Sequence, residues 1–342
     1  MQFPPFLLTP LLLLLSPLPT HTLSSPGCHL PPPPHPPSTP LTLTTTNSSR
    51  TYVLSLPPTY SHSPSLPSPL ILALHGKSQT PTQFSTQTRF HDPAFNTLNA
   101  IVVYPQGVDG MWTGDPEAPT REERDDVRFV GEVMEEVMGR YCVAVERVYV
   151  VGFSNGGGLA QVVACERGVG GRVAAVGICS GAVYKDGSLK GEQVLFDVCE
   201  PGRPVPVMEM HGTRDPVIHF DGVSTPDGET WPVEEWAVEG WKRRNCGEGE
   251  GRDPTWEGYV HEGSVRKRSW SCGEGMENQE VLVHYYIEKF GHGWPNTMKQ
   301  DDDNQRYGPV SWFATKDFVD FFASKSLPTE LGEAEDRVRD EL

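Results

Sequence analysis

Residues 147–158 read RVYVVGFSNGGG, and this stretch decides the fold class of the 342-residue chain. Val148 to Val151 has the length and composition of a buried strand, and the next residues form Gly-x-Ser-x-Gly before a helical run from Leu159 to Cys165. A serine on a sharp turn between strand and helix needs small neighbours, and glycines stand on both sides of Ser154. We therefore predict that Ser154 is a nucleophile and that the backbone N–H of Asn155 faces a developing oxyanion. A glycine-rich helix start with an exposed serine is the alternative interpretation.

A serine hydroxyl attacks at neutral pH only when a base takes its proton, so an acid and a histidine are expected later in the chain. The segment HGTRDPV follows an apolar strand and carries Asp215, and GHGWP follows another strand and carries His292. Ser154, Asp215 and His292 stand in the chain order that α/β-hydrolases use for nucleophile, acid and base. His219 and Asp221 follow Asp215 on the same loop and are the alternative base and acid.

Short apolar segments alternate with segments of helical spacing over most of the chain. Helical spacing is found in Val127 to Tyr141, in Val233 to Asn245 and in Ser311 to Ala323. The alternation predicts an α/β fold with a mostly parallel central sheet flanked by helices, whose chemistry lies beyond the carboxyl ends of the strands. The strand-length segments are Tyr52 to Leu56, Leu70 to Leu74, Ile101 to Tyr104, Val148 to Val151, Val173 to Ile178, Val205 to Met210 and Val281 to Ile287.

Two further loops leave predicted strands at the same edge of the sheet. LALHGKSQT ends the strand Leu70 to Leu74, and this loop of the fold supplies a second oxyanion donor, for which the backbone N–H of Lys77 is the candidate. The next loop carries Trp112, a candidate wall for an apolar or aromatic acyl group, with packing inside the loop as the alternative. His75 and His211 each precede a glycine at a strand end, where we expect them to hold loops by hydrogen bonds.

Composition narrows the classes of function. The chain has 28 Lys and Arg against 45 Asp and Glu, a formal net charge of −17, which argues against nucleic acid as a partner because phosphates repel such a surface. With 33 prolines, 34 glycines and 37% hydrophobic residues, part of the chain is expected to lie unstructured around one large domain. No cluster of His, Cys and Asp has zinc spacing, and Asp301 to Asp303 lacks the glycine and distal glutamate of a calcium loop, so no metal is expected.

Composition along the chain predicts four segments. Residues 1–22 carry a proline-interrupted apolar run typical of a signal peptide, with a disordered proline-rich tail as the alternative. Residues 23–48 are rich in Pro, Ser and Thr and are predicted to be disordered, 49–326 form the catalytic domain, and 327–342 form an acidic tail. No other stretch approaches the length of a membrane span, so a membrane is not expected as a partner.

Seven cysteines without any C-x-x-C spacing favour disulfides and an oxidising compartment. Because seven is odd, at least one cysteine is expected to stay outside a disulfide. Cys246 and Cys272 flank one glycine-rich loop and could join across it, while the connectivity of the others stays open. Asn47 begins the only triplet in the sequence that could accept an N-linked glycan.

Taken in order, several motifs resemble the secreted serine esterase family of fungal feruloyl esterases, acetyl xylan esterases and polyhydroxybutyrate depolymerases. These motifs are LALHGKSQT, VVYPQG, VYVVGFSNGGGLAQVVAC, MEMHGTRDPV and GHGWP, and the resemblance covers roughly residues 50–325. It implies an α/β-hydrolase fold, a serine-esterase mechanism, no cofactor, and plant cell-wall or polyester substrates. The chain departs from the family in its proline-rich N-terminal segment, in an insert around Gly247 to Trp270 and in its acidic tail.

Within that family we expect a feruloyl esterase that releases ferulic acid from plant cell-wall polysaccharide, because Trp112 and Trp294 near the expected cleft suit a phenolic acyl group. Acetyl xylan esterase and polyhydroxybutyrate depolymerase are the alternatives. A non-catalytic polysaccharide-binding protein on the same scaffold is the alternative of another class. We expect a secreted monomer, although Arg339 to Leu342 resembles the retrieval signal of the endoplasmic reticulum, which makes its lumen the alternative location.

Overall fold

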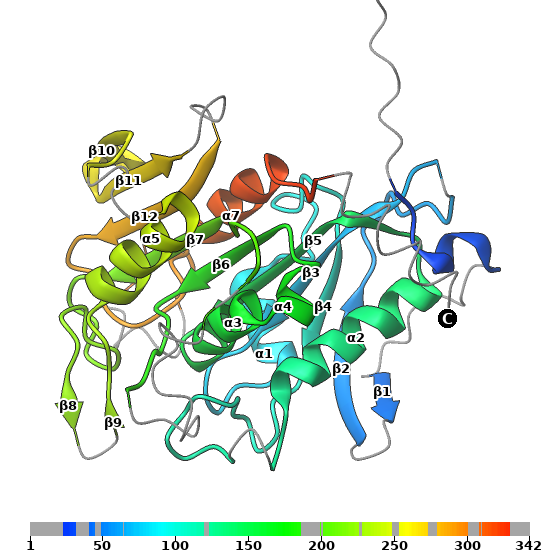
Figure 1. Ribbon diagram of the computed structural model, residues 1–342, viewed down its shortest axis with the longest axis horizontal. Helices are drawn as coiled ribbons and strands as arrows, with labels where there is room; N and C mark the ends of the chain where they lie inside the picture. Colours follow the sequence, from blue (N-terminus) through cyan, green and yellow to red (C-terminus); the bar gives the residue numbers. More distant parts are fainter. Residues whose placement is uncertain are drawn as a thin grey trace, which may run out of the picture.

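The computed structural model describes the chain in several ranges, and its elements follow one another as drawn in Figure 1. The described residues are 23–31, 41–44, 49–63, 65–119, 123–185, 199, 201–225, 228–247, 253–272, 279–299, 308 and 310–328. The elements are η1 (Pro26–His29), β1 (Leu41–Thr44), β2 (Ser49–Ser55), β3 (Ser68–Leu74), α1 (Pro81–Thr88), β4 (Ile101–Pro105), α2 (Asp126–Arg140), β5 (Val143–Phe153), α3 (Asn155–Cys165), α4 (Arg167–Gly170), β6 (Ala175–Cys179), β7 (Val207–Gly212), β8 (Ser224–Thr225), β9 (Gly228–Glu229), η2 (Glu234–Gly240), α5 (Trp241–Cys246), β10 (Trp256–Val260), η3 (His261–Gly263), β11 (Val265–Ser271), β12 (Glu280–Ile287) and α7 (Ala314–Ala323).

A large sheet runs through the middle of the molecule. Among the described strands its order is β1-β2-β4-β3-β5-β6-β7-β12-β11-β10, and β8 pairs with β9 in a separate ribbon. The run from β4 to β12 is parallel throughout, while β2 and β11 pair antiparallel with its outer strands. The predicted α/β fold with a mostly parallel sheet is therefore confirmed. The parallel run places the carboxyl ends of β5, β7 and β12 at one edge, where Ser154, Asp215 and His292 follow.

Helices cover both faces of this sheet (Figure 1). One buried cluster joins the strands to α2, α3 and the η2–α5 segment through side chains such as Val130, Leu159 and Trp236. The cluster on the other face joins them to α1 and α7 through Phe84 and Phe318. The helix expected between residues 233 and 245 has two parts. The first, η2, has π-helical hydrogen bonding, and α5 continues it as an α-helix. Both faces are thus buried, which explains why the central strands are apolar on consecutive residues.

The insert that departs from the family pattern extends the sheet. β10 pairs antiparallel with β11 from Trp256 opposite Ser269 to Val260 opposite Val265, and β11 pairs in turn with β12. A disulfide between Cys246 and Cys272 joins α5 to the end of β11, as the spacing of these cysteines suggested. The insert is therefore an edge hairpin of the main sheet.

Part of the segment that we predicted to be disordered belongs to the folded domain. Residues 23–31 contain η1, and Cys28 within it forms a disulfide with Cys142. Ser25 Oγ also donates to the Tyr141 carbonyl at 2.8 Å, and β1 pairs with β2. The prediction of disorder over residues 23–48 is wrong for these residues, because a covalent link and strand pairing fix segments that bury little apolar surface of their own.

The remaining disulfide joins Cys165 to Cys199, and Cys179 lies buried outside the three disulfides. Some sequence predictions concern residues outside the described ranges. These are the signal peptide at 1–22, the glycan acceptor Asn47, the aspartates at 301–303 and the C-terminal residues 339–342. Among the helices that are described, none is long and apolar enough to cross a bilayer.

Candidate active site

Ser154 lies on a sharp turn between β5 and α3, with φ 53° and ψ −121°. This left-handed region is strained for a residue with a side chain, so the neighbouring backbone must hold it in place. A Cβ on Gly152 would lie 2.1 Å from the Gly156 carbonyl oxygen, and a Cβ on Gly156 would lie 2.3 Å from the Leu74 carbonyl oxygen. Only glycine fits at both positions, which is the physical basis of the Gly-x-Ser-x-Gly pattern here.

The histidine and the acid that were predicted from chain order meet Ser154 in space. His292 Nε2 lies 3.0 Å from Ser154 Oγ, and His292 Nδ1 lies 2.7 Å from Asp215 Oδ2. The other carboxylate oxygen, Oδ1, accepts the backbone N–H groups of Val217 at 2.8 Å and Ile218 at 2.7 Å. Asp215 is therefore held as an acceptor, so the Nδ1 atom of His292 carries a proton and its Nε2 atom can accept one from the serine.

The charge of Asp215 is maintained although the residue is buried. Burial by itself raises the pKa of this carboxyl, but the charge of His292 and the hydrogen bonds from His211 and His292 outweigh it and hold the pKa below its ordinary value. The group is therefore ionised at neutral pH. An ionised Asp215 can stabilise a positive charge that forms on His292.

Two backbone N–H groups near the nucleophile turn are candidates for oxyanion donors. Asn155 follows Ser154 as the first residue of α3, and Lys77 lies in the loop after β3 that packs against the nucleophile turn. Among the described residues, neither of these N–H groups has an intramolecular acceptor. The Lys77 side chain turns to the carboxylates of Asp115 and Glu117, so only its backbone is available to this site. The arrangement fits two oxyanion donors.

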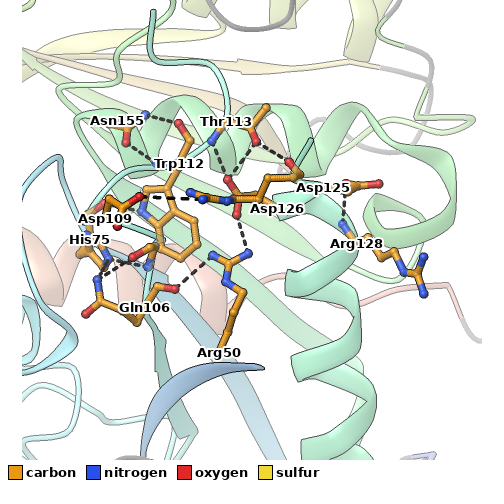
Figure 2. A network of polar contacts seen from close by, with 12 residues as sticks. Arg50, His75, Gln106, Asp109, Trp112, Thr113, Asp125, Asp126, Arg128 and Asn155 are labelled. Carbon is orange, nitrogen blue, oxygen red and sulfur yellow. Dashed lines mark hydrogen bonds and ion pairs between the residues drawn. The ribbon is translucent and has the colours of Figure 1, made fainter. Parts of the chain in front are cut away.

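The side chain of Asn155 locks this turn to the loop that carries Trp112, as Figure 2 shows. Its Oδ1 accepts the Trp112 backbone N–H at 2.8 Å, and its Nδ2 donates to the Trp112 carbonyl at 3.1 Å. The indole Nε1 of Trp112 donates to the His75 carbonyl at 2.8 Å. The same tryptophan therefore connects the loops of both oxyanion candidates.

His75 is a neutral structural histidine in this network (Figure 2). Its Nε2 accepts the Gly107 backbone N–H at 2.9 Å, and burial lowers its pKa to about 4. A buried ion pair supports the loop from the other side, where Arg50 Nη1 lies 2.6 Å from Asp126 Oδ1 and Asp126 Oδ2 accepts the Thr113 backbone N–H. Sequence reasoning did not find this pair, because its two residues are 76 positions apart.

The structure does not place the two predicted substrate-binding tryptophans on a surface. Trp112 and Trp294 are both 0% exposed, with Trp294 Nε1 donating to Thr315 Oγ1 and its ring packed against Phe318. Buried rings cannot contact a bound acyl group, so we correct the expectation that they line the cleft. An aromatic residue next to a site motif in the sequence can as readily pack beneath the site as face it.

The alternative base and acid do not join the constellation. His219 and Asp221 are exposed on the loop after β7, whereas Ser154, Asp215 and His292 are all buried. Sequence reasoning missed Glu209 and His284, which are fully buried behind Asp215 and contact His211 directly or through one another. A charged residue inside the apolar strand VMEMHG was the signal that could have found this group.

This arrangement can transfer an acyl group. A serine hydroxyl that is hydrogen-bonded to an imidazole, which is in turn hydrogen-bonded to an ionised carboxylate, can attack a carbonyl carbon. In the part of the chain that the structure describes, no group of three or more His, Cys, Asp or Glu side chains is arranged to hold a metal ion.

Comparison with known proteins agrees with this fold. The family model described as Esterase PHB depolymerase matches residues 50–215. The acetyl xylan esterase from Aspergillus awamori superposes with a TM-score of 0.52 at 13% identity, over 75% of this chain and 94% of that chain, which shows the shared α/β-hydrolase fold.

Curated relatives show the family. A bifunctional acetylxylan esterase/xylanase, XynS20E of Neocallimastix patriciarum, is 30% identical over 156 residues, or 46% of this chain, and the chain spans only 20% of that protein. Feruloyl esterase C of Emericella nidulans is 32% identical over 214 residues, which are 60% of this chain and 67% of that protein. The resemblance drawn from the motifs is confirmed, and the chain belongs to the esterase family that includes feruloyl esterases, acetyl xylan esterases and polyhydroxybutyrate depolymerases.

Proposed function

We propose that the chain is a secreted serine carboxylic-ester hydrolase whose nucleophile, base and acid are Ser154, His292 and Asp215. The observation that carries this proposal is the continuous pair of contacts, 3.0 Å from Ser154 Oγ to His292 Nε2 and 2.7 Å from His292 Nδ1 to Asp215 Oδ2. The three residues come from three different loops at one edge of the sheet, and Ser154 has a strained backbone conformation there. Strain and convergence at one point are typical of a reaction centre.

The proposed reaction has two halves. Ser154 Oγ attacks the ester carbonyl carbon while its proton passes to His292 Nε2, and the carbonyl oxygen becomes an oxyanion held by the N–H groups of Asn155 and Lys77. The intermediate collapses, and the leaving alcohol takes the proton from His292. Water then attacks the acyl-serine with His292 again acting as base, which releases the acid and restores the serine. Asp215 stabilises the imidazolium in both halves.

For the substrate we propose feruloyl esters of plant cell-wall polysaccharide. The support is the similarity to feruloyl esterases C and B, since the tryptophans that first suggested a phenolic acyl group are buried. A candidate contact is Val217, which is 42% exposed and lies on the Asp215 loop. An exposed apolar side chain beside the reacting groups can pack against an aromatic acyl group.

A side-by-side assay tests the substrate. Methyl ferulate, acetylated xylan and short-chain polyhydroxybutyrate are compared by kcat/KM with the same preparation of the full chain. We expect the highest value for methyl ferulate, and Val217→Ala should raise KM for it while leaving p-nitrophenyl acetate nearly unchanged, because the proposed contact of Val217 is with the aromatic acyl group. Preference for acetylated xylan or for the polyester would overturn the proposed substrate.

The alternative of another class, a non-catalytic polysaccharide-binding protein, predicts binding to xylan without hydrolysis of any of the three esters. The aligned serine, histidine and aspartate argue against it. The proposal of secretion is supported by the three disulfides, which persist in oxidising compartments.

A further inference from the structure

A row of buried polar side chains continues the site beyond Asp215. Glu209 and His211 on β7 and His284 on β12 are each 0% exposed, although all three can carry charge. Burying such groups is costly unless each is paired. The reaction described above uses none of them, so their presence next to the acid needs its own explanation.

The polar contacts along this row indicate which nitrogen atoms of the two histidines carry protons. Arg268 Nη2 lies 3.1 Å from His284 Nδ1, and because a guanidinium can only donate, this nitrogen is the acceptor. The proton of His284 is therefore on Nε2, which lies 3.1 Å from Glu209 Oε2. The other oxygen of Glu209, Oε1, lies 3.1 Å from His211 Nδ1. Glu209 thus has a histidine ring nitrogen 3.1 Å from each of its oxygens, as a hydrogen bond with His211 and at ion-pair distance with His284, and it is suited to stay a carboxylate.

Both ring nitrogens of His211 face oxygen atoms that carry no hydrogen. Nδ1 faces Glu209, while Nε2 lies 2.8 Å from the Ile218 carbonyl oxygen and 3.4 Å from Asp215 Oδ2. A ring that meets acceptors on both sides must donate from both nitrogens, which makes it an imidazolium. Burial opposes this charge, but the hydrogen bonds and charges of Asp215 and Glu209 outweigh burial and raise the pKa of His211 to about 10.

We propose that the His211 imidazolium, held between Glu209 and Asp215, is a positioning residue that fixes the Asp215 carboxylate and keeps it ionised toward His292. The inference rests on the proposed function, because it assigns a role in that same reaction. The polar contacts of His211 are with Glu209, Ile218 and Asp215, so it reaches the reacting groups through Asp215. Its contact is with Oδ2, the oxygen that also accepts from His292.

Residues of its own strand, of the following loop and of β12 surround His211. Its own strand contributes Glu209, and the following loop contributes Asp215 and the uncharged ring of Phe220. On β12, Tyr286 is its partner in strand register, and His284 reaches it only through Glu209. Farther away, Arg268 is neutralised by two contacts with Glu234. The charged groups in direct contact with the His211 ring are therefore the carboxylates of Glu209 and Asp215. His211 in turn is the charged group that contacts Asp215 from this row.

The pH dependence of kcat/KM tests this role through His211→Gln, since glutamine can still donate an N–H near the position of Nε2 but carries no charge. Without the positive charge, the Asp215–His292 pair binds a proton more readily, so the acid limb of the profile should move to higher pH by about one unit. kcat should fall more than KM rises, because substrate contacts are unchanged. The matched control is His219→Gln on the same loop, whose side chain is exposed and whose profile should overlay the wild type.

A second variant keeps the proposal testable if His211→Gln alone fails to fold. His211→Gln alone leaves Glu209 buried with one cation fewer, whereas the double variant E209Q/H211Q removes both charges together. It should also move the acid limb upward, by less than the single variant, because the lost anion is farther from Asp215 than the lost cation. Retention of the wild-type acid limb in a folded double variant would overturn the proposal, even if kcat falls, since a purely structural role lowers activity without moving the limb.

Failure of this inference can be told apart from failure of the proposed function. If Ser154→Ala retains hydrolysis, the proposed reaction itself is wrong. If Ser154→Ala is inactive while the His211 variants keep the wild-type acid limb, the reaction stands and only the role of His211 is wrong.

Discussion

Ser154→Ala is expected to lower the turnover of p-nitrophenyl acetate by about 10⁶-fold. The loss is this large because no other group can form the acyl intermediate, and the remaining oxyanion donors and binding contacts give only residual catalysis. Alanine keeps the Cβ at a position that already tolerates one, so the turn and the fold should persist. Stopped assays at high enzyme concentration measure the residual rate, and circular dichroism checks the fold.

The chain offers a matched control for this variant. Ser85 Oγ also lies 3.0 Å from a histidine nitrogen, Nδ1 of His91, but that pair is exposed and lies outside the site. Ser85→Ala should therefore retain the wild-type rate. Near-normal activity of Ser154→Ala, or an equal loss in Ser85→Ala, would contradict the assignment of the nucleophile.

Asp215→Asn is expected to lower kcat by about 10⁴-fold. The two backbone N–H groups of Val217 and Ile218 hold one side-chain oxygen, so asparagine would keep its carbonyl there and turn its NH₂ toward His292. His292 Nδ1 would then have to accept, which places the ring proton on Nε2, facing the serine. A base in this tautomer cannot take the Ser154 proton. The measurement is kcat at saturating methyl ferulate across neutral pH.

The control for this second variant is Asp221→Asn. Asp221 was the alternative acid. It lies near Asp215 in the sequence and on the same loop, but it is exposed whereas Asp215 is buried. Its variant should remain within the error of the wild type. A larger loss in Asp221→Asn than in Asp215→Asn would reverse the assignment.

Local sequence patterns predicted the central part of the fold and of the site. Buried parallel strands are apolar on consecutive residues, so segments such as Leu70 to Leu74 and Val148 to Val151 could be found without a structure. The nucleophile turn was equally visible, because the steric need for glycine at positions 152 and 156 leaves a direct trace in the sequence. Once strand order is inferred, loops that follow parallel strands must meet at one edge, which brings Asp215 and His292 into the prediction.

Features that depend on distant contacts could not be predicted in the same way. The order of residues 23–31 depends on Cys28 meeting Cys142, a contact across 114 positions that composition does not encode. Burial of Trp112 and Trp294 depends on which side of each loop faces the core, and periodicity does not report this for irregular segments. The role inferred for His211 depends on Glu209, which a search limited to strand ends passes over.

Covalent labelling tests directly whether Ser154 is the nucleophile. The full chain is treated with a fluorophosphonate, which phosphonylates only serines that an adjacent base activates, and the modified residue is located by peptide mass spectrometry. We expect one adduct per chain on Ser154, strongly slowed labelling in His292→Ala and Asp215→Asn, and wild-type labelling in His219→Gln. An adduct on a different serine, or an unmodified protein under conditions that label other serine esterases, would contradict this assignment.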